Sequence, residues 1–398
     1  MIPAWIAFLI VIALIMIFAK RELGIVLFIG TLIFGILTQV DLLTSIITVF
    51  TNPSILILAL AVALIPILGG IMDDSGLMLE LVQKMDVSKK VSLMVSPALF
   101  GLLPIPGGAL MSAPIVDQID SETLKPNQKI AINVWYRHAF LLIYPVSPVL
   151  IVGSYLAGIS LYVIVIAMLI PFMVMCFIGY LTLLRSVDNE RENIERDLKR
   201  VVRNFIPIII APIIDLLGRT FFNLAYPEVF LLIGLILSIW VALLISKISL
   251  VKLKEITKKM KIWRFPLVIF AVFWFLDIFV RSGLPADISA LELPFLVFIC
   301  LGFFLGYATG RVQLPFSILI PVYLIQNGLS AMILLDFVFL YSATFLGYLI
   351  TPIHPCLAYS INYFKTDYKS ALKYLGVPTF SCFGMVIGFY LLFSLLSL

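Results

Sequence analysis

Long apolar runs separated by short polar segments dominate this chain. Runs of about 17–25 residues are long enough to cross a bilayer core of about 30 Å as helices. Because backbone polar groups in lipid must be satisfied internally, such runs predict an all-α membrane protein. We expect about ten transmembrane helices, at 2–19, 24–40, 54–72, 130–156, 160–184, 205–222, 228–246, 263–280, 337–359 and 374–396.

Two further apolar segments, 91–117 and 293–324, carry tips that a continuous helix does not tolerate. The first tip is the Pro-Ile-Pro-Gly-Gly run at 104–108, and the second is Gly-Tyr-Ala-Thr-Gly-Arg at 306–311. Proline and glycine at such density break a helix, so both segments are predicted to be re-entrant hairpins.

The distribution of basic residues supports this topology. With both termini outside, and with each hairpin returning to its own side, the Lys and Arg residues fall on the cytoplasmic side except for Arg219, Arg281 and Arg311. This agrees with the positive-inside rule. If either hairpin crossed the membrane, the basic loops downstream would alternate wrongly.

The chain reads as the same protein twice. Each half has five crossings, an odd number, so the second half is predicted to be inverted relative to the first. We expect a first repeat at 1–185, a cytoplasmic connector at 186–204 and a second repeat at 205–398. The motifs that recur at an offset of about 207 positions are Ser75-Gly76-Leu77 and Ser282-Gly283-Leu284, Pro114 and Pro321, Pro145/Pro148 and Pro352/Pro355, and Pro171 and Pro378.

Two amphipathic segments, 41–52 and 247–261, occupy matching places in the repeats. Either could be an interfacial helix that links the first two spans of its repeat to the rest, or a surface loop. Asp73 and Asp74 end a predicted span beside a basic loop, where we expect them to be solvated.

Composition narrows the class of protein. Hydrophobic residues make up 62% of the chain and charged residues 12%, with a mean hydropathy of +1.16, which excludes a soluble globular domain. The first apolar run has no preceding basic region, so we expect a retained span rather than a signal peptide. There is no nucleic-acid motif and no HExxH or GxSxG, so neither a nucleic-acid partner nor an enzyme is predicted.

The cysteines lie in apolar segments without CxxC spacing, and we interpret them as small core residues. No disulfide, metal site or cofactor is predicted from them; they are Cys176, Cys300, Cys356 and Cys382.

Candidate chemistry gathers where the backbone has to break. The Pro-x-x-Pro segments at 145–148 and 352–355 predict two broken helices, although each could be a kink. A half-helix N-terminus favours a carboxylate or phosphate, and unwound carbonyls suit Na⁺. Ser147 is a good N-cap before Pro148. The candidate substrate-binding residues are Pro106, Gly107, Gly108, Ser112, Ser147, Thr309, Gly310, Arg311, Gln313, Ser317, Thr351 and His354.

Intramembrane charges are functional candidates by default. Asp215 and Asp277 each stand four residues before an arginine, which is the spacing of an intrahelical ion pair; a structural pair and a proton-relay role both remain open. Arg311 has no acid within several residues, and we predict that it holds an anion. His354 lies between prolines and could couple protons or be a hydrogen-bonded structural residue, whereas His138 is interpreted as structural.

The run Pro-Ile-Pro-Gly-Gly-Ala-Leu-Met-Ser-Ala-Pro at 104–114 and the run Thr-Pro-Ile-His-Pro at 351–355 resemble the prokaryotic membrane-protein family called domain of unknown function 401. The order of helices, hairpins and broken helices resembles the ion transporter superfamily, which includes carriers of gluconate, citrate, C4-dicarboxylates and arsenite. This resemblance implies an elevator mechanism and a homodimer.

We therefore expect a secondary active transporter of a small organic anion in the cytoplasmic membrane, driven by H⁺ or Na⁺. The alternative is a cation/proton antiporter in which Asp215 or Asp277 carries the proton.

Overall fold

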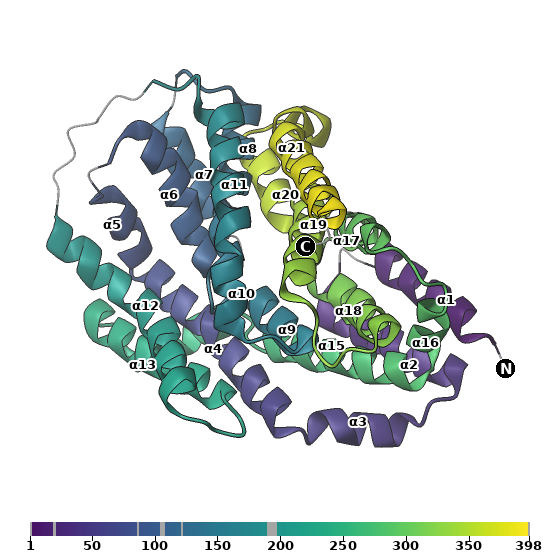
Figure 1. The fold of residues 1–398 in the computed structure, drawn as a ribbon. Coiled ribbons are helices and arrows are strands. Elements are labelled where there is room, and N and C mark those ends of the chain that lie inside the picture. The colour runs from purple at the N-terminus through teal and green to yellow at the C-terminus, as the bar shows by residue number, and fades with distance from the viewer. Residues whose placement is uncertain are drawn as a thin grey trace.

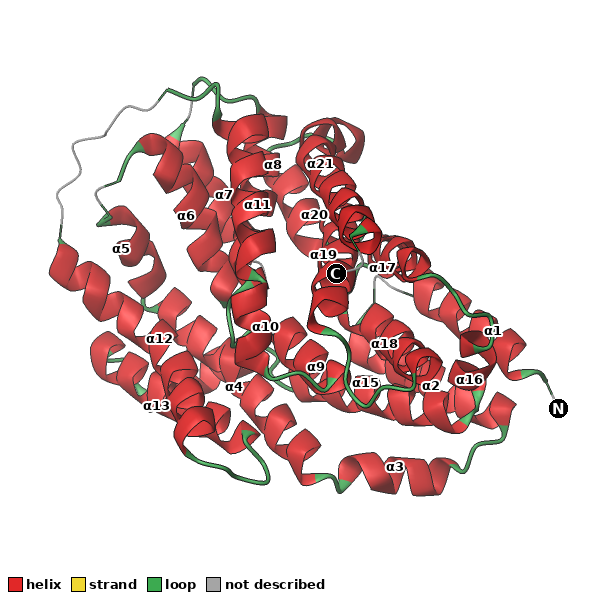
Figure 2. Ribbon diagram, viewed as in Figure 1, coloured by secondary structure: helices red, strands yellow, loops and turns green. Residues whose placement is uncertain are grey.

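A computed structural model describes residues 2–18, 21–85, 87–103, 108–120, 122–188 and 197–396, and every regular element in these ranges is a helix (Figure 2). The first half comprises α1 (Ala4–Ile17), α2 (Leu23–Thr38), α3 (Leu42–Phe50), α4 (Pro53–Asp74), α5 (Leu77–Gln83), α6 (Lys89–Leu102), α7 (Gly108–Ile119), α8 (Pro126–Ala139), η1 (Phe140–Leu142), α9 (Pro148–Ala157), α10 (Leu161–Ala167), α11 (Leu169–Gly179) and η2 (Tyr180–Leu184).

The second half follows a closely similar order. Gly76 and Gly283 precede α5 and α16 with φ of 75° and 74°, a left-handed conformation that favours glycine. The helices are α12 (Leu198–Phe221), α13 (Glu228–Ser246), α14 (Leu250–Lys259), α15 (Arg264–Arg281), α16 (Leu284–Ser289), α17 (Phe295–Thr309), α18 (Gln313–Asn327), α19 (Leu334–Ile350), α20 (Pro355–Tyr363) and α21 (Tyr368–Leu395).

Six helical segments in the described ranges are long and apolar enough to cross a membrane, and a seventh is added if the bent pair α14–α15 is one span. The chain is therefore a multi-pass membrane protein. The helices α1 and α2 have 14 and 16 residues, shorter than a single straight span of about 17–25 residues. The expected ten spans and the orientation of the termini stay predictions. The six are Pro53–Asp74, Leu161–Leu184, Leu198–Phe221, Glu228–Ser246, Leu334–Tyr363 and Tyr368–Leu395.

The two halves pack through equivalent elements. Helix α2 of the first half lies against α15 of the second, and α13 of the second lies against α4 of the first. In the same way α9 packs on α18, and α20 packs on α7. The halves are thus intertwined around a shared core, and the broken-helix segment of each touches the hairpin of the other (Figure 1).

Both amphipathic segments are helices, so the surface-loop alternative is wrong. Asp41 caps α3 by accepting hydrogen bonds from two backbone N–H groups, and α3 runs along one edge of the molecule between α2 and α4 (Figure 1). Helix α14 is held to α4 because Lys259 Nζ lies 2.5 Å from Asp74 and 3.7 Å from Asp73. Asp73 and Asp74 are therefore paired, with side chains only 7% and 12% exposed, rather than solvated as expected.

The connector is shorter than the sequence indicates. Helix α12 begins at Leu198, where the Asp197 side chain accepts a hydrogen bond from the Arg200 N–H, and so it enters the expected 186–204 connector. Part of that connector, 189–196, lies outside the described residues.

Helices α17 and α19 cross at unusually short range through glycines. A Cβ at Gly306 would lie 2.2 Å from the Thr344 carbonyl oxygen, and one at Gly347 would lie 2.0 Å from the Phe303 carbonyl oxygen. Small residues at such spacing let helix backbones approach in membrane proteins. This crossing fixes the second hairpin against the second broken helix.

Candidate functional site

Two helices are interrupted where the paired prolines stand. Helix α8 ends at Ala139, passes through the short 3₁₀ turn η1, and resumes as α9 at Pro148. Helix α19 ends at Ile350 and resumes as α20 at Pro355. Proline suits the first position of a helix because its missing N–H would have no intrahelical partner there. Each break thus starts a new half-helix inside the protein.

The residues just before these prolines leave polar atoms unpartnered. Ser147 and His354 occupy the N-cap positions of α9 and α20 and are 1% and 0% exposed, but neither side chain caps its helix. Ser147 is therefore at the predicted N-cap position, although its hydroxyl makes no capping hydrogen bond. Among the described residues, Ser147 Oγ, His354 Nε2 and the buried Thr351 Oγ1 have no hydrogen-bond partner. Each such group costs about 1–3 kcal/mol and calls for a functional explanation.

The tip of the second hairpin lies against the second break. Gly310 ends α17 with φ of 62°, and a Cβ there would lie 2.7 Å from Ile353 and 3.5 Å from Thr351. Thr309 is tied into its own helix, since its hydroxyl donates to the Leu305 carbonyl at 2.6 Å. Two other candidates lie on α18: Gln313 is its first residue, and Ser317 donates to the Leu314 carbonyl at 2.8 Å.

Arg311 carries positive charge into this region. It is half-buried, and among the described residues no carboxylate oxygen lies within 4.0 Å of its guanidinium. Arg311 and Arg137 both act electrostatically on the hydroxyl of Tyr348. The Tyr348 ring centroid lies 4.4 Å from that of His354. The charges of both arginines therefore act on the tyrosine whose ring packs against His354.

The first hairpin contributes Ser112, which contacts Arg137 of α8. Its expected tip residues Pro106 and Gly107 lie outside the described residues, and Gly108 begins α7. Ser112 on α7 is buried and accepts a hydrogen bond from Arg137 Nη1 at 3.3 Å. Arg137 was predicted to lie on the cytoplasmic side, near the start of the span 130–156, and it is only 5% exposed near the end of α8. Its charge is therefore buried among helices.

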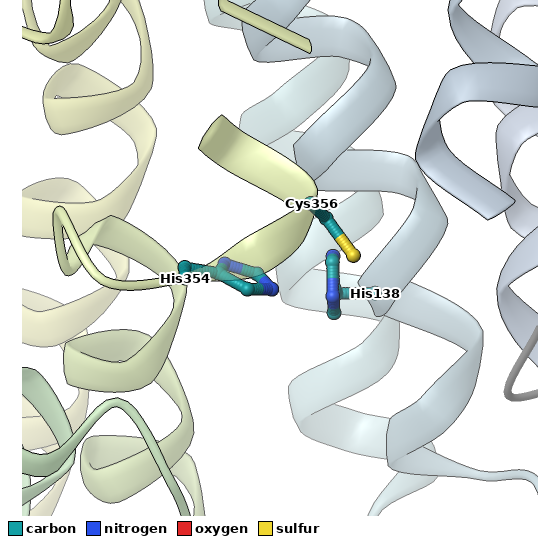
Figure 3. A group of neighbouring side chains, drawn as sticks. All are labelled: His138, His354 and Cys356. Carbon is teal, nitrogen blue, oxygen red and sulfur yellow. The ribbon is translucent and has the colours of Figure 1, made fainter. Parts of the chain in front are cut away.

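Two residues interpreted as structural meet His354. The imidazoles of His138 and His354 have ring centroids 4.6 Å apart. The ligand atoms of His138, His354 and Cys356 all lie within 4.8 Å of one another, and their side chains converge between α8 and α20 (Figure 3). The only sequence signal for this cluster is the His-x-Cys spacing at 354–356, because His138 comes from the other half of the chain.

Both acids expected to be coupling candidates make intrahelical ion pairs. Asp277 lies 2.6 Å from Arg281 Nε. Asp215 is buried, accepts a hydrogen bond from Arg219 Nε at 2.8 Å and another from the Tyr162 hydroxyl at 3.0 Å.

Sequence reasoning missed Glu228, which begins α13. It is 9% exposed, and among the described residues its Oε2 has no hydrogen-bond partner. Glu228 and Arg219 line the same small cavity. A buried carboxylate therefore lies close to the Asp215–Arg219 pair.

A larger cavity of about 330 Å³ lies between α11, α19 and α21. Its walls are almost wholly apolar, including Ile170, Val338 and Phe389. Such walls suit hydrocarbon and offer an anion no counter-charge, so the polar region at the breaks is the better candidate for a charged ligand.

Comparison with known proteins identifies a matching sequence family and two similar folds. The sequence model of the family described as "Protein of unknown function (DUF401)" matches residues 4–390. No curated protein sequence matches significantly. The fold is similar to that of the YdaH transporter of Alcanivorax borkumensis, with a TM-score of 0.55 and 16% identity over 82% of this chain and 85% of that chain. It is also similar to MtrF of Neisseria gonorrhoeae, described within a class of antimetabolite efflux pumps, with a TM-score of 0.58 and 14% identity over 87% and 83% of the two chains.

Proposed function

We propose that this chain, which belongs to the DUF401 family, is a secondary active transporter of a small organic anion in the cytoplasmic membrane. Its multi-pass helical architecture and its fold similarity to YdaH and MtrF support a transporter in general. We also propose a carboxylate-type substrate, coupling to H⁺ or Na⁺, and membership of the ion transporter superfamily, which the order of helices and hairpins resembles.

The observation that carries the proposal is the second break. The N-terminus of α20 presents the positive end of a helix dipole, and the buried hydroxyl of Thr351, in the break before it, has no hydrogen-bond partner among the described residues. Arg311 approaches the same region without a carboxylate partner among the described residues. A planar guanidinium binds a carboxylate by two parallel hydrogen bonds. An anion at this break would satisfy groups that are otherwise costly to bury.

The transport movement that we propose is an elevator in a homodimer. Hairpins and broken helices, α6–α9 and α17–α20, would form the moving unit, and α1, α2, α12 and α13 the scaffold. The contacts of α2 with α15 and of α13 with α4 show that each pair of scaffold helices packs on the helix that precedes the hairpin of the other half. Alternating access in repeat transporters is largely a rigid-body motion of one unit against the other around the site.

The test is ligand binding by the purified protein and by Arg311→Gln. Succinate, citrate, gluconate and phosphate are each titrated in a thermal-shift assay, with and without Na⁺ and at two pH values. Losing charge-assisted hydrogen bonds worth about 1.5–3 kcal/mol should weaken binding by about tenfold or more. Arg185→Gln, which changes an exposed arginine, is the matched control and should bind as the wild type does. Equal affinities in Arg311→Gln and Arg185→Gln would refute the anion site.

A cation/proton antiporter is the second candidate, and Glu228 is the observation that favours it. Its buried, incompletely bonded carboxylate lines a cavity with Arg219, the partner of Asp215. A buried carboxylate with an oxygen that lacks a hydrogen-bond partner is suited to bind a proton or a metal ion. Proton flux that depends on Na⁺ without any organic anion, and that is lost in Glu228→Gln, would support this candidate over the first.

A further inference from the structure

We propose that His138, His354 and Cys356 form a binding site for Zn²⁺ at the second helix break. Imidazole nitrogen and thiolate sulfur are the ligands that zinc prefers in proteins. Both histidines are buried, at 2% and 0% exposure, and Cys356 is half-buried. The proposal stands independently of anion transport, because a metal can be titrated without any organic ligand.

The ligand atoms are close to the geometry that the metal requires. Tetrahedral zinc at about 2.0–2.1 Å from nitrogen and about 2.3 Å from sulfur separates its ligand atoms by about 3.3–3.6 Å. The three ligand atoms in the protein lie within 4.8 Å of one another. The most widely separated ligand atoms therefore have to approach by about 1.2–1.5 Å at most, which rotation of the side chains can supply. Figure 3 shows the thiol and both rings directed toward a common centre.

Backbone carbonyls orient both rings in the way that is typical of metal-binding histidines. His138 Nδ1 lies 2.7 Å from the Val134 carbonyl oxygen, and His354 Nδ1 lies 3.2 Å from the Leu349 carbonyl oxygen. Each Nδ1 therefore carries the proton and donates it, and each Nε2 keeps a free lone pair for a metal. His354 Nε2 is buried and has no hydrogen-bond partner among the described residues. That atom is an independent indication of a missing ligand.

The charge of the surroundings limits the affinity but does not exclude the metal. Arg137 acts electrostatically on Cys356 and would repel a cation. A thiolate offsets one of the two charges on Zn²⁺, so the occupied cluster would carry a net charge of about +1. Three protein ligands leave a fourth tetrahedral position for water or an anion. The ligands come from both halves of the chain, so the metal would tie α8 to the start of α20.

The experiment uses the full-length protein in detergent after removal of metals with a chelator. Zn²⁺ should bind with a stoichiometry of one per chain and raise Tm. Co²⁺, a spectroscopic substitute, should produce the near-ultraviolet charge-transfer band of a cobalt–thiolate bond. Cys356→Ser should lose that band and weaken Zn²⁺ binding by about tenfold or more, as expected when one ligand is removed. His354→Gln should weaken Zn²⁺ binding similarly.

Cys382→Ser is the control, because Cys382 is another free cysteine and lies outside the cluster. It should keep both the charge-transfer band and the affinity. The proposal is overturned if wild-type protein with Co²⁺ shows no thiolate band, or if Cys356→Ser binds Zn²⁺ as tightly as Cys382→Ser does. Anion titrations repeated in the presence of the chelator separate the failure of the metal site from the failure of the anion site.

Discussion

Replacing Gly306 by alanine tests the close crossing that holds the second hairpin to the second broken helix. A Cβ at this position would lie 2.2 Å from the Thr344 carbonyl oxygen, whereas ordinary contact begins at 3.4 Å. The two helices would therefore have to separate locally by about 1 Å. A gap of that size removes about a quarter to a half of the van der Waals attraction of each neighbouring contact. Overpacking of this kind costs about 1–3 kcal/mol, against a gain in helix propensity of about 1 kcal/mol.

The assay is thermal unfolding in detergent, compared with Gly384→Ala. A Cβ at Gly384 on α21 meets nothing within 4 Å, so this control gains helix propensity without a clash. We expect Gly306→Ala to lower Tm and Gly384→Ala to leave it unchanged or raise it. If Gly306→Ala unfolds at the same temperature as Gly384→Ala, the short approach between α17 and α19 is wrong.

The remaining predictions concern two polar contacts. Ser360→Ala removes the acceptor of a 2.9 Å hydrogen bond from the buried Asn133 and should lower the free energy of unfolding by about 1–3 kcal/mol, which denaturant titration measures. Ser394→Ala, on an exposed residue of α21, should change it little. Burial opposes ionisation of Asp120, but hydrogen bonds from Lys89, Thr123 and Leu124 outweigh it and hold its pKa well below the usual range. A lowered folded-state pKa stabilises the protein above the unfolded-state pKa of about 3.9, and this stability is lost as the pH falls toward the folded-state pKa. Asp120→Asn should therefore lose less stability than the wild type between about pH 5 and pH 2, and an identical pH profile would contradict this assignment.

The helix starts and the intrahelical ion pair can be predicted from the sequence because they follow from local rules. A proline without an N–H cannot continue a helix, so Pro148 and Pro355 mark helix starts from sequence alone. The spacing of Asp215 and Arg219 likewise predicts their ion pair, because residues four apart share a helix face.

Contacts between distant segments account for the rest. His138 and Cys356 meet only because α8 packs against α20, and no periodicity in the sequence encodes that contact. Ser147 stands at the predicted N-cap position of α9, but the sequence does not show that its hydroxyl makes no capping hydrogen bond. The burial of Arg137 could not be read from the charge pattern, which assigns it only to the cytoplasmic side.

Transport by the reconstituted protein tests the central claim most directly. Wild type and Arg311→Gln are reconstituted in proteoliposomes, and uptake of labelled succinate, citrate or gluconate is measured under an imposed proton or Na⁺ gradient. The account predicts gradient-dependent uptake of at least one of these anions by the wild type, reduced about tenfold or more in Arg311→Gln and retained in Arg185→Gln. Uptake that is equal in the two variants, or absent for every anion in the wild type, would contradict it.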